Sequence, residues 1–244
     1  MKRYLIYVLF GLLFSAQALS KDLSIVADSW APMTDATLIE SGFSIHFAKI
    51  MLKELGYTPS VKFQTWKRIR KDMGTTKYDM VAAVWHDKDR EALMHFTIPY
   101  ETNRLVFVSR LNQKFNYLGP ESLKGKSLGL ISSYAYPDEI LKAKGVNLQY
   151  VVGAKQNILK LARGRIDMTI GDYLVMKYEA GRSLTVNQNL YYDLKHPIAE
   201  IPLYMAVSRQ HPDHEKIVAG LNRLIRQYKS DGTYSNLQLQ HGLE

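Results

Sequence analysis

Short apolar runs alternate with amphipathic segments of about ten residues along almost the whole chain, and this alternation is the feature that most limits its possible folds. Residues 23–27 form such a run. Residues 44–55 follow, with apolar side chains at spacings of three and four before Gly56. Strands that alternate with amphipathic helices are typical of βαβ units, whose strands pair mainly in parallel. The pattern therefore predicts an α/β fold with mainly parallel sheets.

The same criteria assign the remaining elements, without a linker rich in Pro, Gly or Ser between the two halves of the chain. The predicted strands are residues 23–27, 60–64, 78–84, 105–109, 127–131, 148–152, 166–170, 189–193 and 201–207. The predicted helices are residues 44–55, 66–73, 138–143, 157–162, 172–180, 214–229 and 234–240.

A short internal similarity links the two halves. Lys77-Tyr78-Asp79-Met80 opens one predicted strand, and Arg165-Ile166-Asp167-Met168 opens another. The match is either a coincidence among common α/β sequences or the sign of two similar lobes, and the pattern alone leaves both open.

Residues 1–20 have the pattern of a secretory signal peptide: Lys2 and Arg3, an apolar run over residues 4–14, and the small-x-small sequence Ala16-Gln17-Ala18. The apolar run is shorter than the roughly 20 residues that a membrane-spanning helix needs. The alternative is an uncleaved anchor or a buried helix. We predict cleavage after Ala18 or Ser20. Because no cysteine is present to carry a lipid, we expect the protein free in a bacterial periplasm.

The charge balance is basic, with 32 Lys and Arg against 23 Asp and Glu and a net charge of +9. Such a balance can indicate nucleic-acid binding. Here the basic residues are spread along the chain, apart from a cluster at residues 67–71, and no nucleic-acid-binding motif accompanies them. We therefore predict that the cluster is a solvated helix face, with no nucleic-acid partner.

Sequence motifs for metals and cofactors are missing as well. The absence of cysteine excludes disulfides, cysteine-ligated zinc and thiol catalysis. The sequence contains no glycine-rich phosphate loop, no nucleophile elbow and no His-Glu-x-x-His. We predict no cofactor and no metal.

The three tryptophans of the protein, Trp30, Trp66 and Trp85, each follow one of the first three predicted strands. A single Trp at such a position is usually a partly buried core residue. Ligands of open α/β sheets bind outside the carboxyl ends of the strands. Three tryptophans at one edge therefore favour an aromatic wall against a ligand.

Two charged residues occupy equivalent positions. Arg90 lies in the predicted turn after the third strand, and Asp172 lies just past the strand of residues 166–170. A guanidinium binds a carboxylate through two parallel hydrogen bonds, and a carboxylate accepts from an ammonium. The pair could bind a zwitterion. The alternatives are a surface salt bridge for Arg90 and a helix N-cap for Asp172.

A series of segments, in this order and spacing, resembles the bacterial extracellular solute-binding proteins of family 3, the periplasmic receptors of polar amino-acid ABC importers. The resemblance covers about residues 23–242. The segments are Ser29-Trp30-Ala31-Pro32, Gly42-Phe43-Ser44-Ile45, Glu54-Leu55-Gly56-Tyr57, Lys77-Tyr78-Asp79-Met80, Asp89-Arg90-Glu91, Phe96-Thr97-Ile98-Pro99-Tyr100, Gly125-Lys126-Ser127-Leu128-Gly129, Gly164-Arg165-Ile166-Asp167 to Asp172, and Asp231-Gly232-Thr233-Tyr234.

The resemblance implies a two-lobed periplasmic binding protein of type II, in which two α/β lobes close on a ligand about a two-strand hinge. Residues 1–20 would be the signal peptide, residues 21–107 plus 204–244 lobe 1, and residues 108–203 lobe 2. It further implies a non-enzymatic monomer that captures a small polar or zwitterionic solute and delivers it to an ABC permease.

In the family, the arginine that matches Arg90 holds the ligand carboxylate and the aspartate that matches Asp172 holds the α-ammonium. The residues that match Trp30 and Trp66 contact the ligand side chain.

The sequence departs from the family pattern at the expected site. Ala82-Ala83-Val84-Trp85 stands where serine hydroxyls usually support the carboxylate, and Ser133-Tyr134-Ala135 replaces a Gly-Thr-Thr-like loop. Each lost hydrogen bond is worth about 0.5–1.5 kcal/mol. We therefore expect a larger or flatter ligand that also contacts Trp85 and Tyr134.

Two other functions stay open. The family resemblance includes cyclohexadienyl dehydratases, enzymes that eliminate water and CO2 from prephenate or arogenate and need a general acid in the cleft. His86, Asp87 and Asp172 are the candidates at this edge. The other alternative is a sensor that reports its ligand to a partner protein.

Overall fold

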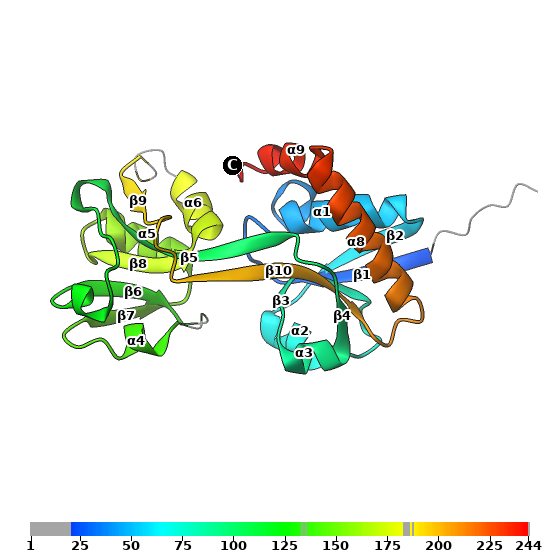
Figure 1. The fold of residues 1–244 in the computed structure, drawn as a ribbon, viewed down its shortest axis with the longest axis horizontal. Helices are drawn as coiled ribbons and strands as arrows, with labels where there is room; N and C mark the ends of the chain where they lie inside the picture. Colours follow the sequence, from blue (N-terminus) through cyan, green and yellow to red (C-terminus); the bar gives the residue numbers. More distant parts are fainter. Residues whose placement is uncertain (1–20, 133, 135, 183–185, 187, 244) are drawn as a thin grey trace, which may run out of the picture.

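The computed structural model describes residues 21–132, 134, 136–182, 186 and 188–243, and it contains two α/β lobes joined by two long strands (Figure 1). The joining strands are β5 (Glu101–Arg110) and β10 (Ala199–Ser208). The predicted signal peptide lies outside the described residues. The predicted lobe boundaries, at residues 107 and 204, fall inside these two strands.

Lobe 1 is built from two stretches of the chain on either side of lobe 2. Its elements are β1 (Lys21–Ala27), η1 (Ile39–Ser41), α1 (Phe43–Glu54), β2 (Tyr57–Phe63), α2 (Trp66–Asp72), β3 (Met80–Trp85), α3 (Lys88–Leu93), β4 (Met94–Phe96), α8 (His214–Ser230) and α9 (Thr233–Gln240).

Lobe 2 is formed by the segment between the two long strands. Its elements are η2 (Leu111–Gln113), η3 (Pro120–Leu123), β6 (Ser127–Ile131), α4 (Asp138–Leu141), β7 (Asn147–Val151), α5 (Ala154–Ala162), β8 (Met168–Asp172), α6 (Tyr173–Gly181) and β9 (Leu190–Tyr192).

One sheet runs through both lobes in the order β2-β1-β3-β10-β5-β8-β6-β7. Strands β2, β1 and β3 are parallel in lobe 1, and β7, β6 and β8 are parallel in lobe 2. All pairings of β5 and β10 are antiparallel. The expectation of mainly parallel pairing thus holds within each lobe and is wrong for the centre. There, β5 carries the chain out to lobe 2 and β10 returns it, so the two strands run in opposite directions.

Each lobe has its own apolar core. The buried clusters of lobe 1 draw on residues 23–100 and 203–243, and those of lobe 2 draw on residues 105–201. In α1 the predicted apolar face, with Ile45, Ala48 and Leu52, is fully buried. Burial of a large side chain such as Ile45 or Leu52 stabilises the lobe by roughly 1.5–3 kcal/mol.

The short internal similarity has a structural counterpart. In lobe 1, one carboxylate oxygen of Asp79 accepts hydrogen bonds from Ser24 N and Oγ, both at 2.7 Å. In lobe 2, Asp167 accepts from Ser127 N and Oγ, both at 2.8 Å. Each Asp ends the loop before a strand that pairs in parallel with the strand of its Ser. Of the two explanations for the similarity, the structure favours a shared lobe architecture.

The hydrogen bonds of Asp79 with Ser24 and of Asp167 with Ser127 should stabilise the protein equally. We expect Asp79→Ala and Asp167→Ala each to lower the free energy of unfolding by about 1.5–3 kcal/mol, because each removes two hydrogen bonds to a charged group. Urea unfolding measures the loss, and Asp138→Ala, at a highly exposed carboxylate, should change stability by no more than about 0.5 kcal/mol. A loss at only one of the two Asp positions would contradict the equivalence.

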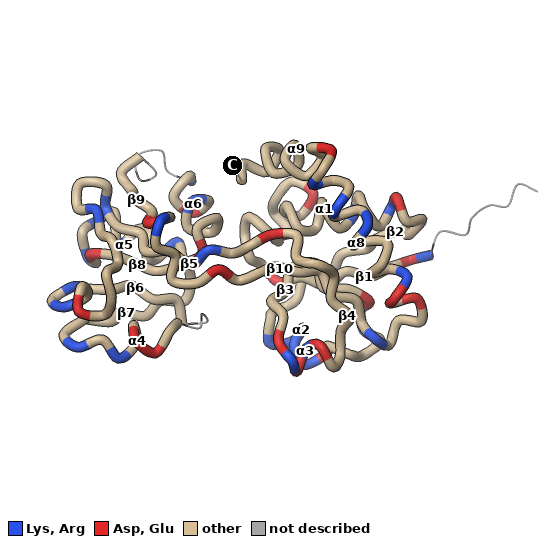
Figure 2. The backbone as a smooth tube through the Cα atoms, in the orientation of Figure 1, with Lys and Arg blue, Asp and Glu red and all other residues tan. Residues whose placement is uncertain are grey.

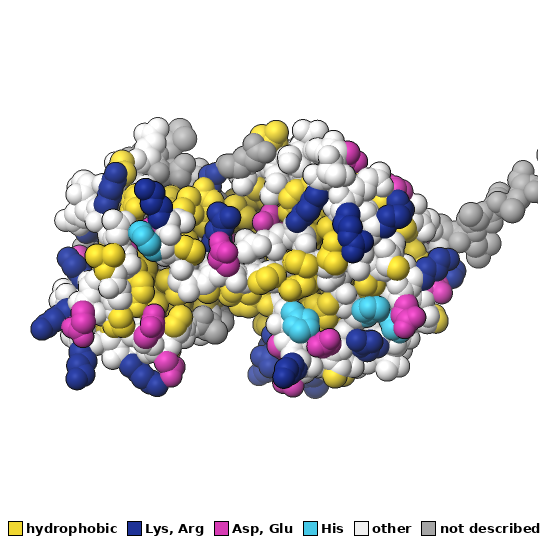
Figure 3. Space-filling model, in the orientation of Figure 1, with side chains coloured by type: hydrophobic (Ala, Val, Ile, Leu, Met, Phe, Trp, Pro, Cys, Tyr) yellow, Lys and Arg dark blue, Asp and Glu magenta, His cyan; other side chains and the backbone are white. Residues whose placement is uncertain are grey.

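Charged residues are distributed over both lobes (Figure 2). The basic cluster of residues 67–71 lies on α2, where every member except buried Ile69 is exposed, as predicted for a solvated helix face. On the face seen in Figure 3, apolar side chains run along the middle of the molecule and charged ones lie mostly toward the outer parts of the lobes. Among the described residues, the structure contains no helix long and apolar enough to span a membrane.

Candidate functional site

The aromatic residues predicted to line the site make contact across the two lobes. Trp30 lies three residues after β1, and Trp85 ends β3. Their rings meet edge to face with centroids 6.1 Å apart. Trp30 Nε1 also donates to the Tyr134 hydroxyl of lobe 2 at 3.4 Å. The side chain of Trp30 therefore touches both lobes at the edge where their parallel strands end.

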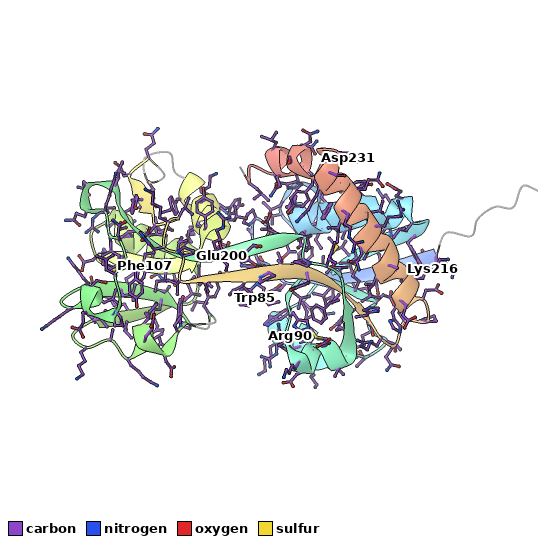
Figure 4. The ribbon with its side chains drawn as sticks, viewed as in Figure 1. Trp85, Arg90, Phe107, Glu200, Lys216 and Asp231 are labelled. Carbon is purple, nitrogen blue, oxygen red and sulfur yellow. The ribbon has the colours of Figure 1, made fainter. Side chains whose placement is uncertain are left out.

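Arg90 lies in the short helix α3 and not in a turn as predicted. Six residues are too few to show a helical period, but Asp87 caps the helix by accepting from Arg90 N at 2.8 Å. Figure 4 shows Trp85 beside the two long strands, with Arg90 in the neighbouring part of lobe 1.

The Arg90 guanidinium is largely engaged within lobe 1. Nε contacts Asp87 Oδ2 at 2.9 Å, and Nη1 donates to the Trp85 carbonyl at 2.6 Å. The guanidinium also lies over the Trp66 ring, 5.3 Å from its centroid. Burial lowers the pKa of Arg90, while the Asp87 carboxylate opposes that shift. These contacts engage Nε and Nη1, so a ligand carboxylate at this edge would bind chiefly through Nη2.

Asp172 is the last residue of β8 and the N-cap of α6, because its Oδ1 accepts from Val175 N at 3.1 Å. The alternative given for Asp172, a helix N-cap, is therefore confirmed, yet the cap uses only one carboxylate oxygen. The side chain is 1% exposed, and Oδ2 has no hydrogen-bond partner among the described residues. Burial raises the pKa of Asp172 to about 6, against the lowering effect of nearby amide donors.

Asn103 is a site residue that the sequence reading missed. It lies in β5, is fully buried, and accepts from Trp85 Nε1 through its Oδ1 at 2.9 Å. The predicted strand begins two residues later, at residue 105. An asparagine two residues before a run of apolar strand residues, and therefore on the same face of the strand as Leu105, is the signal that could have revealed it, since buried amides need partners.

Two further polar groups lie at this edge of lobe 1. Asp28 follows β1, and burial raises the pKa of its carboxyl group. The charge of Asp28 acts on Tyr134, whose pKa is raised by burial above all and also by the charges of Asp172 and Asp28. Gln64, which precedes α2, has a buried Oε1 without a partner among the described residues. The site therefore has an acidic character on both sides.

All six predicted residues belong to one connected group. The contacts given above form a chain of neighbours that runs through Trp66, Arg90, Trp85, Trp30 and Tyr134. Asn103 contacts Trp85 and extends this group toward Asp172. No described cluster of three or more His, Asp or Glu side chains has the arrangement of a metal site.

A cavity of about 370 Å³ adjoins this group between the lobes. None of the six predicted residues lines it. Pro32, two residues after Trp30, and Leu174, two residues after Asp172, do line it. Figure 1 shows the C-terminal end of the chain close to α6 at this position. The remaining lining residues are Lys177, Tyr178, Gly181, Arg182, His241, Gly242 and Leu243.

Comparison with known proteins shows similar binding proteins. The chain is 23% identical over 199 residues to the L-cystine-binding protein TcyA of Bacillus subtilis (strain 168), covering 81% of this chain and 70% of that protein. It is 24% identical over 180 residues to the arginine-binding periplasmic protein of Mannheimia haemolytica, covering 72% of each.

Solved structures share the fold. A putative binding component of an ABC transporter from Wolinella succinogenes, complexed with lysine, superposes with a TM-score of 0.72 at 18% identity, covering 91% of this chain and 96% of that one. An ancestral amino acid-binding protein, described as a precursor of cyclohexadienyl dehydratase, superposes with a TM-score of 0.67 at 20% identity, covering 90% and 94%. These matches confirm the type II two-lobed fold.

The sequence pattern of the bacterial extracellular solute-binding proteins, family 3, matches residues 24–244, nearly the whole chain beyond the predicted signal peptide. Together with the two lobes and the residues that meet between them, this match shows that the chain belongs to the bacterial extracellular solute-binding proteins, family 3.

Proposed function

We propose that the protein is a periplasmic receptor that captures an amino acid or a similar ammonium-bearing solute between its lobes and delivers it to an ABC importer in the inner membrane. The observation that carries the proposal is the buried Asp172 carboxylate, whose Oδ2 has no partner among the described residues. An uncompensated buried carboxylate is costly, and an ammonium group would satisfy it.

The surroundings of Asp172 support the same class of ligand. Trp30, Trp85 and Tyr134 present aromatic rings nearby, and such rings attract cations. Arg90 is neutralised in part by Asp87, whereas Asp28 adds an acidic group. Solutes named for relatives and for structural neighbours include cystine, arginine and lysine. All three carry an α-ammonium.

A thermal-shift experiment tests the proposal. The exported protein is purified, refolded from denaturant to remove bound solute, and heated with L-arginine, L-lysine or L-cystine. A ligand at 100 times its dissociation constant adds about 2.7 kcal/mol of stability. For a chain of this size that raises Tm by roughly 5–10 °C. No shift with any of the three solutes would contradict the proposal for this ligand class.

Arg90→Ala should weaken binding of the amino acid that responds by about 10- to 100-fold. The variant removes the guanidinium that would donate to the ligand carboxylate, and a charge-assisted hydrogen bond contributes about 1.5–3 kcal/mol. Isothermal titration calorimetry measures the change. The matched control is Arg70→Ala, an exposed arginine on α2, which should alter affinity less than about twofold. Equal affinities for wild type and Arg90→Ala would remove Arg90 from the site.

A second candidate function is enzymatic, as in a cyclohexadienyl dehydratase. The observation that favours it is the pKa of Asp172, about 6, which suits a general acid. One structural neighbour is also described as a precursor of that enzyme. Incubation with prephenate decides between the two functions, since loss of water and CO2 would yield phenylpyruvate, which is detected by its absorbance. Wild-type protein that leaves prephenate unchanged would exclude this candidate.

A further inference from the structure

Asn103 and Asp172 each hold a buried polar atom without a partner among the described residues. In Asn103 it is the amide nitrogen Nδ2, and in Asp172 it is the carboxylate oxygen Oδ2. Both side chains are buried, at 0% and 1% exposed. A buried donor or acceptor that is left unpaired destabilises a protein, because it has lost its hydrogen bonds to water without replacement. A donor and an acceptor left unpaired on neighbouring side chains, at the edge where the two lobes meet, could both be satisfied by one bound group.

The two side chains are neighbours. Strand β5 pairs with β8 so that Leu105 lies opposite Asp172. Asn103 lies two residues before Leu105, on the same face of β5, because side chains alternate along a strand. The Asn103 amide lies close enough to Asp172 to act as a weak hydrogen-bond donor, which lowers the pKa of that carboxyl group. The donor of one side chain and the acceptor of the other therefore lie side by side, but they do not form a hydrogen bond of good geometry, so each can pair with a ligand group instead.

Trp85 determines which way the Asn103 amide is turned. An indole N–H is a donor only, so the amide atom that faces Trp85 Nε1 at 2.9 Å must be the oxygen. Without that contact, the oxygen and nitrogen of an asparagine amide could exchange places. With it, the NH2 group is directed away from Trp85. The bulky ring that stands where the family has serines thus holds a different donor in place.

We propose that Asn103 is a ligand-binding residue, held by Trp85 so that its NH2 group donates to an oxygen on the ligand atom next to the ammonium that Asp172 receives. This inference rests on the proposed function and makes it more specific. The ligand group that satisfies both side chains has an ammonium and a carbonyl or carboxylate oxygen on adjacent carbons. The site selects α-amino acids over simple amines, although the supporting serines are replaced by Ala82 and Ala83.

The test compares amino acids with their decarboxylated counterparts. The pairs are L-arginine and agmatine, L-lysine and cadaverine, and L-cystine and cystamine, measured by calorimetry on the refolded, exported protein. Asn103→Ala should weaken binding of the responding amino acid by about tenfold or more, since the bond that is lost is made to a charged carboxylate. Binding of the matching amine should change less than twofold.

Two further variants separate binding from structure. Trp85→Phe keeps an aromatic ring but removes the N–H that fixes the amide, so it should reproduce part of the selective loss for the amino acid. Thr102→Val alters the adjacent residue on the opposite face of β5 and should leave both affinities unchanged. Circular dichroism and Tm of the ligand-free variants show whether each one is folded.

The outcomes distinguish the inference from the proposed function. A loss that is confined to the amino acid supports Asn103 as a donor to its carboxylate. No loss in Asn103→Ala, or an equal loss for both members of a pair, overturns the inference while the proposed function stands. A wild-type protein that binds none of the six compounds overturns the proposed function, and the inference with it.

Discussion

Asp172→Asn should weaken the binding of an ammonium-bearing solute by a factor of about 100 to 1,000 while making the ligand-free protein more stable. Removing one partner of a buried ion pair costs about 3–5 kcal/mol, which is two or more orders of magnitude in affinity. Asparagine has the same shape as aspartate. It can still cap α6 through Oδ1, so the helix should be preserved.

The ligand-free variant should be more stable because it no longer buries a charged carboxylate. Burial raises the pKa of Asp172 from 3.8 to about 6, so the folded protein disfavours the charged form at neutral pH. A shift of this size corresponds to about 3 kcal/mol, because one pKa unit is worth about 1.4 kcal/mol. A neutral amide avoids that penalty, and Tm of the ligand-free protein should rise by several degrees.

Calorimetric titration and thermal unfolding at pH 7.5 measure both effects. Asp167→Asn is the matched control, because that carboxylate accepts hydrogen bonds from Ser127 and should be stabilising. The control should lower Tm and leave affinity unchanged. A variant at position 172 that keeps its affinity, or loses stability, would show that the carboxylate is structural.

Acid should weaken ligand binding steeply, by about 100-fold between pH 7 and pH 4. The ammonium pairs with the ionised Asp172, and its raised pKa of about 6 means that the carboxyl group of the ligand-free protein takes up a proton below that pH. Affinity should therefore fall by about tenfold for each pH unit below 6, through proton linkage. The pKa of Tyr134, which also faces Asp172, is raised by burial, so its hydroxyl stays neutral over this range.

Asp172 should affect folding stability in the opposite direction: acid lowers ligand affinity, but it favours the folded state at this residue. A carboxyl whose folded pKa is raised contributes stability below its unfolded pKa of 3.8, and loses that contribution as the pH rises through about 6. Acid should therefore remove ligand binding before it removes the fold at this site. Titration calorimetry from pH 4 to pH 8 measures the profile, and Asp172→Asn should bind equally weakly throughout. A flat profile in the wild-type protein would exclude Asp172 as the ammonium partner.

Individual elements show which kinds of sequence signal predict structure. The strand of residues 127–131 is predicted to the residue, and α1 and α8 begin and end within one residue of their predicted bounds. These elements bury a regular apolar pattern, which a sequence displays directly. Helix α3 and strand β4 were missed, since elements of six and three residues carry no period.

The candidate site likewise contains residues that local sequence patterns predict and residues that they do not. Trp30, Trp66, Trp85, Arg90, Tyr134 and Asp172 could be selected because strand ends and family motifs mark their positions. Asn103 could not, since its role depends on Trp85, 18 residues away, and on Asp172 in another lobe. The engagement of Arg90 by Asp87 and the Trp85 carbonyl is likewise a matter of geometry.

The sequence by itself determined the α/β class, the order of most elements and the edge at which the site lies, because apolar periodicity and turn residues act over a few neighbouring positions. Only the tertiary structure decided the antiparallel pairing of β5 and β10, the partners of Arg90 and the unpaired atoms of Asn103 and Asp172. Those features arise where segments distant in the chain meet, and burial there sets which polar groups are satisfied and which are left for a ligand.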